Sequence, residues 1–466
     1  MGPRRPDRER RMTVQTYTDR PAEVRATTSS ALLENGASRT SADLVTAIDV
    51  GTTKVCTIVG YKIGQRGVRI LAHSTVPCDG LRKGNVANIA ATANAIKESI
   101  REIEEATGHR IDSAFVGVTG SHIMFENRRD PLEPPMAEGV ITEDDLNDVP
   151  TPSSVLLEEP GRKLIQVVRM NYTLDGEEGI RNPVGMHSER VEVDTHLVTG
   201  SASFVSKLAH AVESAGIKVT SLVLEPLASA LAVMTSRERA RGTLLVDIGG
   251  GTTDVVGFSR GQVCYTGVIP VGGFQFTNDI VITFNTTYQA AEDVKLEYAS
   301  TEQQMSAPTR EITLPVVGQD IALKLQPGEV VQLTRERAQE LAQLIRIKLD
   351  EDGVDAAVRS RIVLTGGTSN LPGLAELIQR SLSVPVRKGV PDVGGAFPAE
   401  LKDPKYATGV GILLWALNEY VPPVKRANDE PNTSIEMGSV GFMPGLLRRI
   451  GRLMPGFFFT KRKGRR

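Results

Sequence analysis

The sequence LLVDIGGGTTDVVGF, residues 244–258, predicts the fold of this chain. Apolar residues 244–246 and 255–256 flank a turn with three consecutive glycines, the pattern of two buried strands joined by a tight turn. Glycine lets the backbone come close to a ligand, and the N–H groups of such a turn can hold phosphate oxygens. An ordinary hairpin is the alternative interpretation. The predicted phosphate-binding residues are Gly249, Gly250, Gly251, Thr252 and Thr253.

Residues 46–60, TAIDVGTTKVCTIVG, repeat this motif in the N-terminal half of the chain. Each hairpin has an aspartate at a strand end, Asp49 or Asp247, where a carboxylate can hold a divalent cation through water. We therefore expect two similar domains that face each other and bind one polyphosphate, with its metal ion, between them. The phosphate-binding residues predicted from the repeat are Gly51, Thr52 and Thr53.

Three further positions carry candidate chemistry. The carboxylate of Glu225, just before a predicted helix, can orient a water toward a terminal phosphate, or it only supplies favourable charge at a helix N-terminus. Glu292 and Lys295 lie on one face of another predicted helix, where they contact a ribose or form a surface ion pair. Gly366 and Gly367 let a flat base pack against bare backbone, or they belong to an ordinary turn between strand and helix.

Length and composition exclude several classes of protein. A chain of 466 residues is too long for one hydrophobic core, so two or more domains are expected. The net charge of −2 argues against general nucleic-acid binding, and the three cysteines have no metal or disulfide spacing. Neither a secretory signal nor an uninterrupted transmembrane span is apparent, which predicts a cytoplasmic main body. Residues 1–41, rich in Arg, Ser and Thr, are predicted to be a disordered extension, with a tether to an acidic partner as the alternative.

The segment after the first hairpin has the pattern of one half of a doubly wound α/β domain. Helical spacing of isoleucines predicts a helix over residues 86–107, and an apolar run predicts a strand over residues 113–120. Toward the C-terminus, residues 301–329 are predicted to be strands and turns, followed by a helix over residues 334–349.

Residues 121–196 interrupt this domain. They contain several strand patterns and one short helix, for which Thr142 and Asp145 form a predicted cap. A small inserted domain without a catalytic cluster is therefore expected. Its histidines are too far apart in sequence for a local metal motif and are predicted to be structural: His122, His187 and His196.

The C-terminal segment combines a linker with an amphipathic helix. Residues 421–440 are rich in proline and polar residues and are predicted to be flexible, with a reach on the order of 25 Å. From Pro444 onward, apolar residues fall on one side of a helix and arginines on the other, which is typical of a helix lying in a membrane surface. Packing on the protein's own core is the alternative. The predicted membrane contacts are Leu446, Leu447, Arg448, Arg449, Ile450, Arg452, Leu453 and Phe457.

The two hairpins and the three further positions, in this order, resemble the actin/Hsp70/sugar-kinase superfamily. Within it the chain is most similar to the FtsA family of bacterial cell division proteins, from about residue 43 to the C-terminus. The narrower resemblance rests on TGSHI at residues 119–123, GIRNPVGM at residues 179–186, Lys54 in the first phosphate loop, and the amphipathic tail. It implies an α/β fold: the duplicated actin-like ATPase fold of two facing RNase H-like domains, with a small inserted α+β subdomain. It also adds Lys54 to the nucleotide-binding residues.

The resemblance implies a division of the chain into subdomains. These would be 1A (residues 42–118, 198–240 and 373–420), 1C (119–197), 2A (241–279 and 360–372) and 2B (280–359), followed by the linker (421–443) and the membrane-targeting tail (444–466).

The resemblance also implies a function. It suggests an ATP- and Mg²⁺-binding scaffold with at most weak ATPase activity, which polymerises at the division septum on the cytoplasmic face of the cell membrane. Its implied partners are the C-terminal peptide of FtsZ (through subdomain 2B), other copies of itself, anionic lipids and other divisome proteins. A small-molecule kinase of the sugar-kinase type and a PilM-like pilus-assembly protein are the alternatives. The amphipathic tail favours the scaffold.

Overall fold

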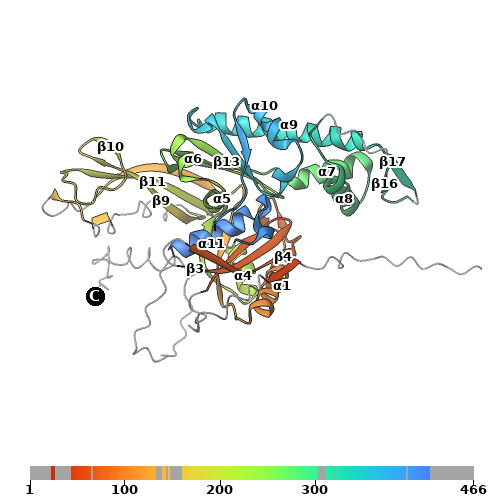
Figure 1. Cartoon of the computed structure of the whole chain (residues 1–466), viewed down its shortest axis with the longest axis horizontal. Helices are drawn as coiled ribbons and strands as arrows, with labels where there is room; N and C mark the ends of the chain where they lie inside the picture. The colour runs from red at the N-terminus through yellow and green to blue at the C-terminus, as the bar shows by residue number, and fades with distance from the viewer. Residues whose placement is uncertain are drawn as a thin grey trace, which may run out of the picture.

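We describe the fold from a computed structural model, in which the two domains and the insert form an elongated molecule (Figure 1). The described residues are 23–26, 44–63, 67–132, 139–142, 145–146, 160–302, 311–319, 321–394 and 397–419. The predicted linker and membrane contacts, residues 421–466, lie outside this part of the chain. Within it, no helix is long and apolar enough to cross a membrane.

The first domain is built on a six-stranded sheet in the order β1-β4-β3-β2-β7-β12. Strands β2, β3 and β4 are antiparallel neighbours, whereas β2, β7 and β12 run parallel. Helices α1 and α4 cover one face of the sheet, and α5 and α11 cover the other. Because both faces are covered, every residue of β2 is buried. The bounds are β1 Glu23–Ala26, β2 Val45–Val50, β3 Lys54–Ile63, β4 Gly67–Pro77, β7 Ser113–Val118, β12 Lys218–Leu224, α1 Ile89–Thr107, α4 Ala202–Ser214, α5 Glu225–Val233 and α11 Ala407–Glu419.

Strand β1 corrects one prediction. It pairs antiparallel with β4 at the edge of the first sheet, so residues 23–26 of the predicted disordered extension form a strand. The physical reason is that β3 pairs with only one edge of β4. The other edge has a row of free N–H and C=O groups, and β1 pairs with them.

Helix α1 begins later than the predicted residue 86. Its N-cap is Asn88, whose side-chain oxygen accepts a hydrogen bond from the backbone N–H of Ala91 at 3.1 Å. Residues just before it form a short hairpin, β5 Leu81–Arg82 with β6 Asn85–Val86.

The second domain repeats the architecture with a five-stranded sheet in the order β15-β14-β13-β18-β19. A small lobe beyond it (α7, α8, β16, β17 and the start of α9) has its own apolar core. The bounds are β13 Thr243–Ile248, β14 Thr253–Ser259, β15 Gln262–Ile269, β16 Ile312–Pro315, β17 Ala322–Leu325, β18 Ile362–Thr365, β19 Val386–Lys388, α6 Ser236–Arg241, α7 Gly273–Phe284, α8 Tyr288–Tyr298, α9 Pro327–Glu351 and α10 Leu374–Leu382. Single turns of 3₁₀ helix are η4 Val358–Ser360, η5 Gly367–Asn370, η6 Ala399–Leu401 and η7 Pro404–Tyr406.

Two predictions in this domain were wrong. Helix α9 begins at Pro327 rather than at residue 334, because the Glu329 carboxylate accepts a hydrogen bond from the Gln326 N–H at 2.8 Å and so caps an earlier first turn. The predicted boundary at residue 373 also fails, since α10 packs against α9 and β19 pairs with β18. Both elements therefore belong to the second domain. The physical reason is that β19 forms hydrogen bonds with the backbone N–H and C=O groups on the free edge of β18.

The inserted subdomain, predicted between the first-domain strands, is a four-stranded antiparallel sheet in the order β10-β9-β11-β8. Reciprocal hydrogen bonds between Thr142 and Asp145 confirm the predicted cap. The insert packs on β15 of the second domain, where the Asn127 amide donates to the Cys264 carbonyl at 2.8 Å. The bounds are β8 Met124–Pro131, β9 Arg162–Leu174, β10 Glu177–Ile180 and β11 Val191–Ser201.

His196 lies within this contact and is structural, as predicted. Its ring is buried between Asn127 Oδ1 at 2.6 Å and the Thr266 hydroxyl at 3.3 Å. Burial lowers the pKa of His196 to about 4, so the ring is neutral at pH 7.

Candidate functional site

The turns of the two predicted hairpins meet between the domains. A β-carbon on Gly250 would lie 2.6 Å from Cγ2 of Thr53, and one on Gly251 would lie 2.3 Å from Oγ1 of Thr52. Only glycine allows this approach, because any larger side chain would push the two turns apart. The structure thus brings together two loops that are far apart in the sequence, with threonine hydroxyls of one against bare backbone of the other.

Asp49 and Asp247 are buried beside these loops, at the ends of β2 and β13. Burial raises the pKa of Asp49 to about 6; the Lys54 ammonium opposes this shift and the Asp247 carboxylate adds to it. Burial also raises the pKa of Asp247, against the hydrogen bonds that Ser229 and Thr408 donate to it at 2.6 and 3.3 Å. The two predicted metal ligands are therefore close enough to influence each other electrostatically.

Asp254 belongs to the same cluster, although the sequence analysis did not select it. Its carboxylate accepts hydrogen bonds from the Thr119 hydroxyl and, at 3.0 Å, from the Thr252 hydroxyl. Burial raises its pKa to about 7, and the nearby negative charge of Asp247 adds to that shift. The sequence contains a signal that could have identified Asp254. Both hairpins contain Thr-Thr, and a charged residue follows this pair in each, Lys54 in the first hairpin and Asp254 in the second.

Lys54 lies at the junction of the first loop and the last helix. Its ammonium donates to the Lys405 carbonyl at 2.5 Å and lies 4.6 Å from the ring centre of Tyr406, just before α11. It is the cation that opposes the pKa rise of both Asp49 and Asp247. Lys54 of the first loop therefore lies close enough to the two predicted metal ligands to lower their pKa values.

Glu225, the predicted catalytic residue, is the first residue of α5 and is buried. Its pKa is raised well above the usual range by burial and by the negative charges of Asp49, Asp254 and Asp247. The structure thus places it with the other three carboxylates. Its position at a helix N-terminus is compatible with either predicted role.

The remaining predicted residues, those for the ribose and the base, lie in the second domain. Glu292 and Lys295 form an ion pair at 2.7 Å that is more buried than a surface pair, with side chains 25% and 16% exposed. The Thr277 hydroxyl donates to Glu292 and accepts from Lys295, which ties α8 to α7. Gly366 has φ +86°, and a β-carbon on it would lie 2.3 Å from Asp247 Oδ1. This position next to the aspartate therefore requires glycine. Gly367 is the first residue of η5. Contact of these residues with a ribose or base stays a prediction.

The acidic cluster suits a hard divalent cation. Carboxylate oxygens are the ligands that Mg²⁺ prefers, and a cation would relieve the repulsion between Asp49 and Asp247. Among the described residues, no group of three His, Cys, Asp or Glu side chains could hold a metal ion alone. Water and phosphate oxygens would therefore complete the coordination, as is usual for Mg²⁺.

The raised pKa of Asp254 leads to a stability prediction. The folded protein keeps the proton of this carboxyl up to about pH 7, whereas the unfolded chain loses it near pH 4. The folded state therefore binds more protons between these values, and stability falls as the pH rises through this window. Asp254→Asn, which is neutral throughout, should be more stable than wild type by on the order of a few kcal/mol at pH 8, and equal near pH 4.

Thermal unfolding at pH 4, 6 and 8 measures this difference. Asp112→Asn is the matched control, because its side chain is 75% exposed and the substitution should give no pH-dependent gain. An Asp254→Asn variant that is less stable than wild type at pH 8 would show that the site stabilises the charged carboxylate.

Two family models match this chain, and several known proteins are similar to it. The family model described as "Cell division protein FtsA" matches residues 244–411, and "SHS2 domain inserted in FTSA" matches residues 120–199. FtsA of Pseudomonas aeruginosa is 33% identical over 406 residues, which cover 86% of this chain and 97% of that protein. The chain belongs to the FtsA family. FtsA of Escherichia coli K12 is 31% identical over 390 residues, covering 82% of this chain and 92% of that protein.

The FtsA family assignment confirms the resemblance inferred from the sequence. The fold is confirmed too: a "PilM-PilN type IV pilus biogenesis complex" superposes with a TM-score of 0.57, over 80% of this chain and 98% of that one. At 22% sequence identity this likeness concerns the fold alone. An actin-like duplicated α/β fold with an inserted SHS2 domain is therefore the architecture of this member of the FtsA family.

Proposed function

We propose that this chain binds Mg-ATP between its two domains and serves as a membrane-attached, polymerising scaffold of bacterial cell division. The meeting of the two glycine–threonine loops beside buried carboxylates carries the proposal. Calorimetric titration of the full chain with Mg-ATP tests it, and the absence of any binding would overturn it.

In the proposed complex, backbone N–H groups and hydroxyls of both loops hold the phosphates, and Lys54 adds a positive charge. Asp49 and Asp247 hold Mg²⁺ through water, and the ion neutralises phosphate charge. The Glu292–Lys295 pair faces the ribose, and the turn at Gly366 and Gly367 accommodates the base. The contact between Thr277 and the ion pair supports this by holding both side chains in one place.

The electrostatics of Glu225 favour nucleotide binding over rapid turnover. Burial and three neighbouring carboxylates raise its pKa when no metal ion is bound, which disfavours the charged form that a general base needs. This supports a scaffold in which ATP mainly stabilises a conformation, with at most weak hydrolysis.

For the scaffold role, we infer that the chain polymerises at the septum and binds FtsZ, other divisome proteins and anionic lipids. Membership of the FtsA family supports the division role, and the amphipathic C-terminal sequence supports a position on the cytoplasmic face of the cell membrane. The lobe of α7 and α8 exposes large apolar side chains, Ile282 at 71% and Leu296 at 65%. An apolar surface of this kind suits the C-terminal peptide of FtsZ in subdomain 2B.

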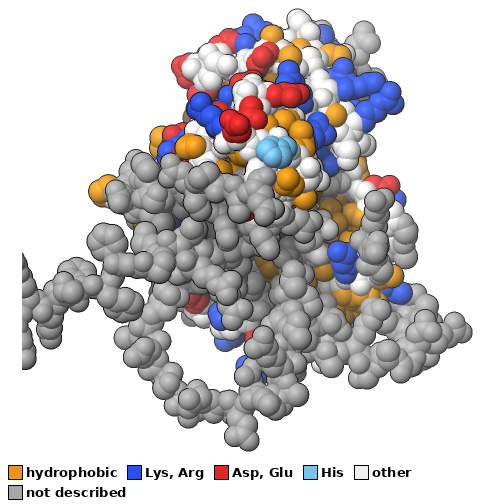
Figure 2. Space-filling view, turned by 90° about the vertical axis from the view of Figure 1, so that its left-hand side faces the viewer, with side chains coloured by type: hydrophobic (Ala, Val, Ile, Leu, Met, Phe, Trp, Pro, Cys, Tyr) orange, Lys and Arg blue, Asp and Glu red, His pale blue; other side chains and the backbone are white. Residues whose placement is uncertain are grey.

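The inserted subdomain is the proposed contact between successive copies. Figure 2 shows the end of the molecule that it forms, where side chains of both charges surround apolar ones. Such a mixed surface is typical of an interface with an apolar centre and a polar rim. Val184 and Met186, within the motif at residues 179–186, are exposed apolar residues of this subdomain.

We therefore expect Val184→Glu/Met186→Glu to stop filament formation on anionic lipid while Mg-ATP affinity stays unchanged. Two buried charges in an apolar contact would be costly to desolvate. Substitution is preferable to deletion of the insert, because deletion would uncover the face of β15 on which the insert packs. Electron microscopy on lipid monolayers measures the effect. Ile63→Glu/Val390→Glu is the matched control, since both residues are exposed outside the insert. Normal filaments from the insert variant would contradict the proposal.

A further inference from the structure

The short hairpin of β5 and β6, which the sequence analysis did not select, lies against both phosphate loops. Its two-residue turn consists of Lys83 and Gly84. The Gly84 N–H donates to the Thr52 hydroxyl of the first loop at 3.3 Å. A β-carbon on Gly84 would lie 3.2 Å from Cγ2 of Thr252 in the second loop. The turn of this hairpin therefore approaches one residue of each loop.

Packing of the hairpin fixes this position. Leu81 is only 2% exposed, and the Gly80 carbonyl accepts a hydrogen bond at 2.9 Å from the N–H of Asn88, the N-cap of α1. The segment before the hairpin is tied to the first loop, because the Cys78 N–H donates to the Thr53 carbonyl at 3.0 Å. The turn thus has the rigid support that a binding residue requires.

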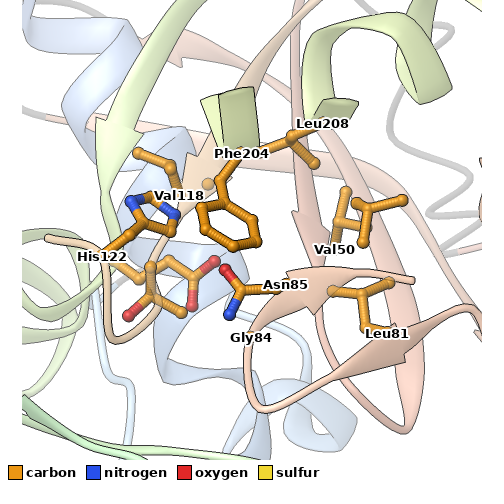
Figure 3. A pocket seen from close by; sticks show the side chains of 12 residues that line it. Val50, Leu81, Gly84, Asn85, Val118, His122, Phe204 and Leu208 are labelled. Carbon is orange, nitrogen blue, oxygen red and sulfur yellow. The ribbon is translucent and has the colours of Figure 1, made fainter. Parts of the chain in front are cut away.

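The turn lies at the same end of the site as Glu225. Gly84, Thr119 and Glu225 line one small cavity, and Figure 3 shows Gly84 and Asn85 of the hairpin among its lining residues. Glu225 is the residue whose predicted role is to orient a water toward a terminal phosphate. The hairpin turn is therefore on the side of that phosphate, whereas the turn at Gly366 is the predicted place of the base.

Lys83 is the cation of this hairpin that can reach the loops. It is exposed, and among the described residues it forms no ion pair. Its Cα is about 3.8 Å from that of Gly84, and its four-carbon stem is flexible. Arg82 is different, because its guanidinium donates to the carbonyls of Asp79 and Leu81 at 3.0 and 2.9 Å.

We propose that Lys83 binds the terminal phosphate of ATP, which makes the β5–β6 hairpin a third element of the nucleotide site. The four buried carboxylates already give this site a high density of negative charge beside Lys54, and a triphosphate adds more. A lysine ammonium is a common phosphate ligand and acts there as a point charge. The inference rests on the proposed function, because it adds one residue to the proposed Mg-ATP site.

The conformation of the turn supplies a matched pair of variants. Lys83 has φ +48° and Gly84 has φ +75°, as a type I′ turn requires, and asparagine is preferred to lysine at the first position. Arg260 occupies the same position, with φ +50°, in the turn between β14 and β15. Lys83→Asn and Arg260→Asn therefore remove the same charge from the same kind of turn, and both suit the backbone.

Calorimetry of the full chain with Mg-ATP and with Mg-ADP tests the proposal. Lys83→Asn should lower the affinity for Mg-ATP by about 10-fold or more, because a hydrogen bond between two charged groups is lost. Its affinity for Mg-ADP, which lacks the terminal phosphate, should stay unchanged. Lys83→Arg keeps the charge and should keep the preference for Mg-ATP. Arg260→Asn should leave both affinities as in wild type.

Thermal unfolding separates this role from a structural one. Lys83→Asn should be at least as stable as wild type, because asparagine tolerates the left-handed backbone, so a weaker affinity for Mg-ATP would not come from a damaged fold. Unchanged Mg-ATP affinity in Lys83→Asn, or an equal loss for Mg-ADP, would overturn the proposal while the proposed function stands. Failure of wild type to bind Mg-ATP would refute the proposed function, and this inference with it.

Discussion

Asp247→Ala should weaken Mg-ATP binding by at least about 100-fold, which corresponds to about 2.7 kcal/mol. The substitution removes a carboxylate that we propose as a Mg²⁺ ligand, and Asp49 alone would then have to hold the ion. The fold should tolerate the change, because Asp247 is a buried acid with a raised pKa, and its charge is costly in the free protein. The two hydroxyls that donate to it, Ser229 and Thr408, lie 3.0 Å apart and can bond to each other.

Calorimetry with Mg-ATP measures the loss, and circular dichroism checks that the variant is folded. Glu102→Gln is the matched control, since Glu102 is a buried carboxyl of the first domain away from both loops and should leave the affinity unchanged. Wild-type affinity in Asp247→Ala would refute the role of the two hairpins as a clamp for Mg-ATP.

Truncation after Val440 should abolish co-sedimentation with anionic liposomes and leave Mg-ATP binding intact. A helix of about eleven residues is too short to be stable alone in water, so the tail should fold only on lipid. Each Arg or Lys near an anionic surface contributes about 1 kcal/mol, and partly buried apolar residues add comparable amounts, less the cost of ordering the segment. A single tail would therefore bind modestly and in a salt-dependent manner.

A filament that presents many tails would bind far more tightly through avidity, which couples polymerisation to membrane attachment. Leu447→Glu/Ile450→Glu should reproduce the truncation by placing charge on the apolar face of the helix. Replacing two residues of the linker, Asn432→Glu/Ser434→Glu, adds the same charge outside the predicted helix and serves as the control. If the truncated chain sediments with liposomes as wild type does, the tail is not the membrane anchor.

Local signals were sufficient to predict the hairpins and most of the elements around them. Strand β2 and strand β13 are apolar runs that end in an aspartate and a glycine turn, and such runs are strand signals regardless of their surroundings. The repeat of this motif predicted the duplicated fold, because two copies of one hairpin need two similar domains to hold them. The start of α9 was missed because its cap uses Gln326 and Glu329, which an apolar period does not reveal.

The course of the chain between the domains could not be predicted from such signals. Strand β19 has only three residues, too few for a period, and its membership of the second sheet follows from the free edge of β18. Residues 374–388 were therefore assigned to the wrong domain.

The sequence by itself determined the two loops and the aspartates beside them, because these depend on neighbours in the chain, whereas the amphipathic tail stays a prediction. Only the tertiary structure placed Asp254 against Thr119, Lys54 against the Lys405 carbonyl, and His122 beside Glu225. Each of these contacts joins residues more than 100 positions apart, and the periodicity of a sequence contains no information about such pairs. The raised pKa values of Asp254 and Glu225 likewise arise from burial and from charges that folding brings together.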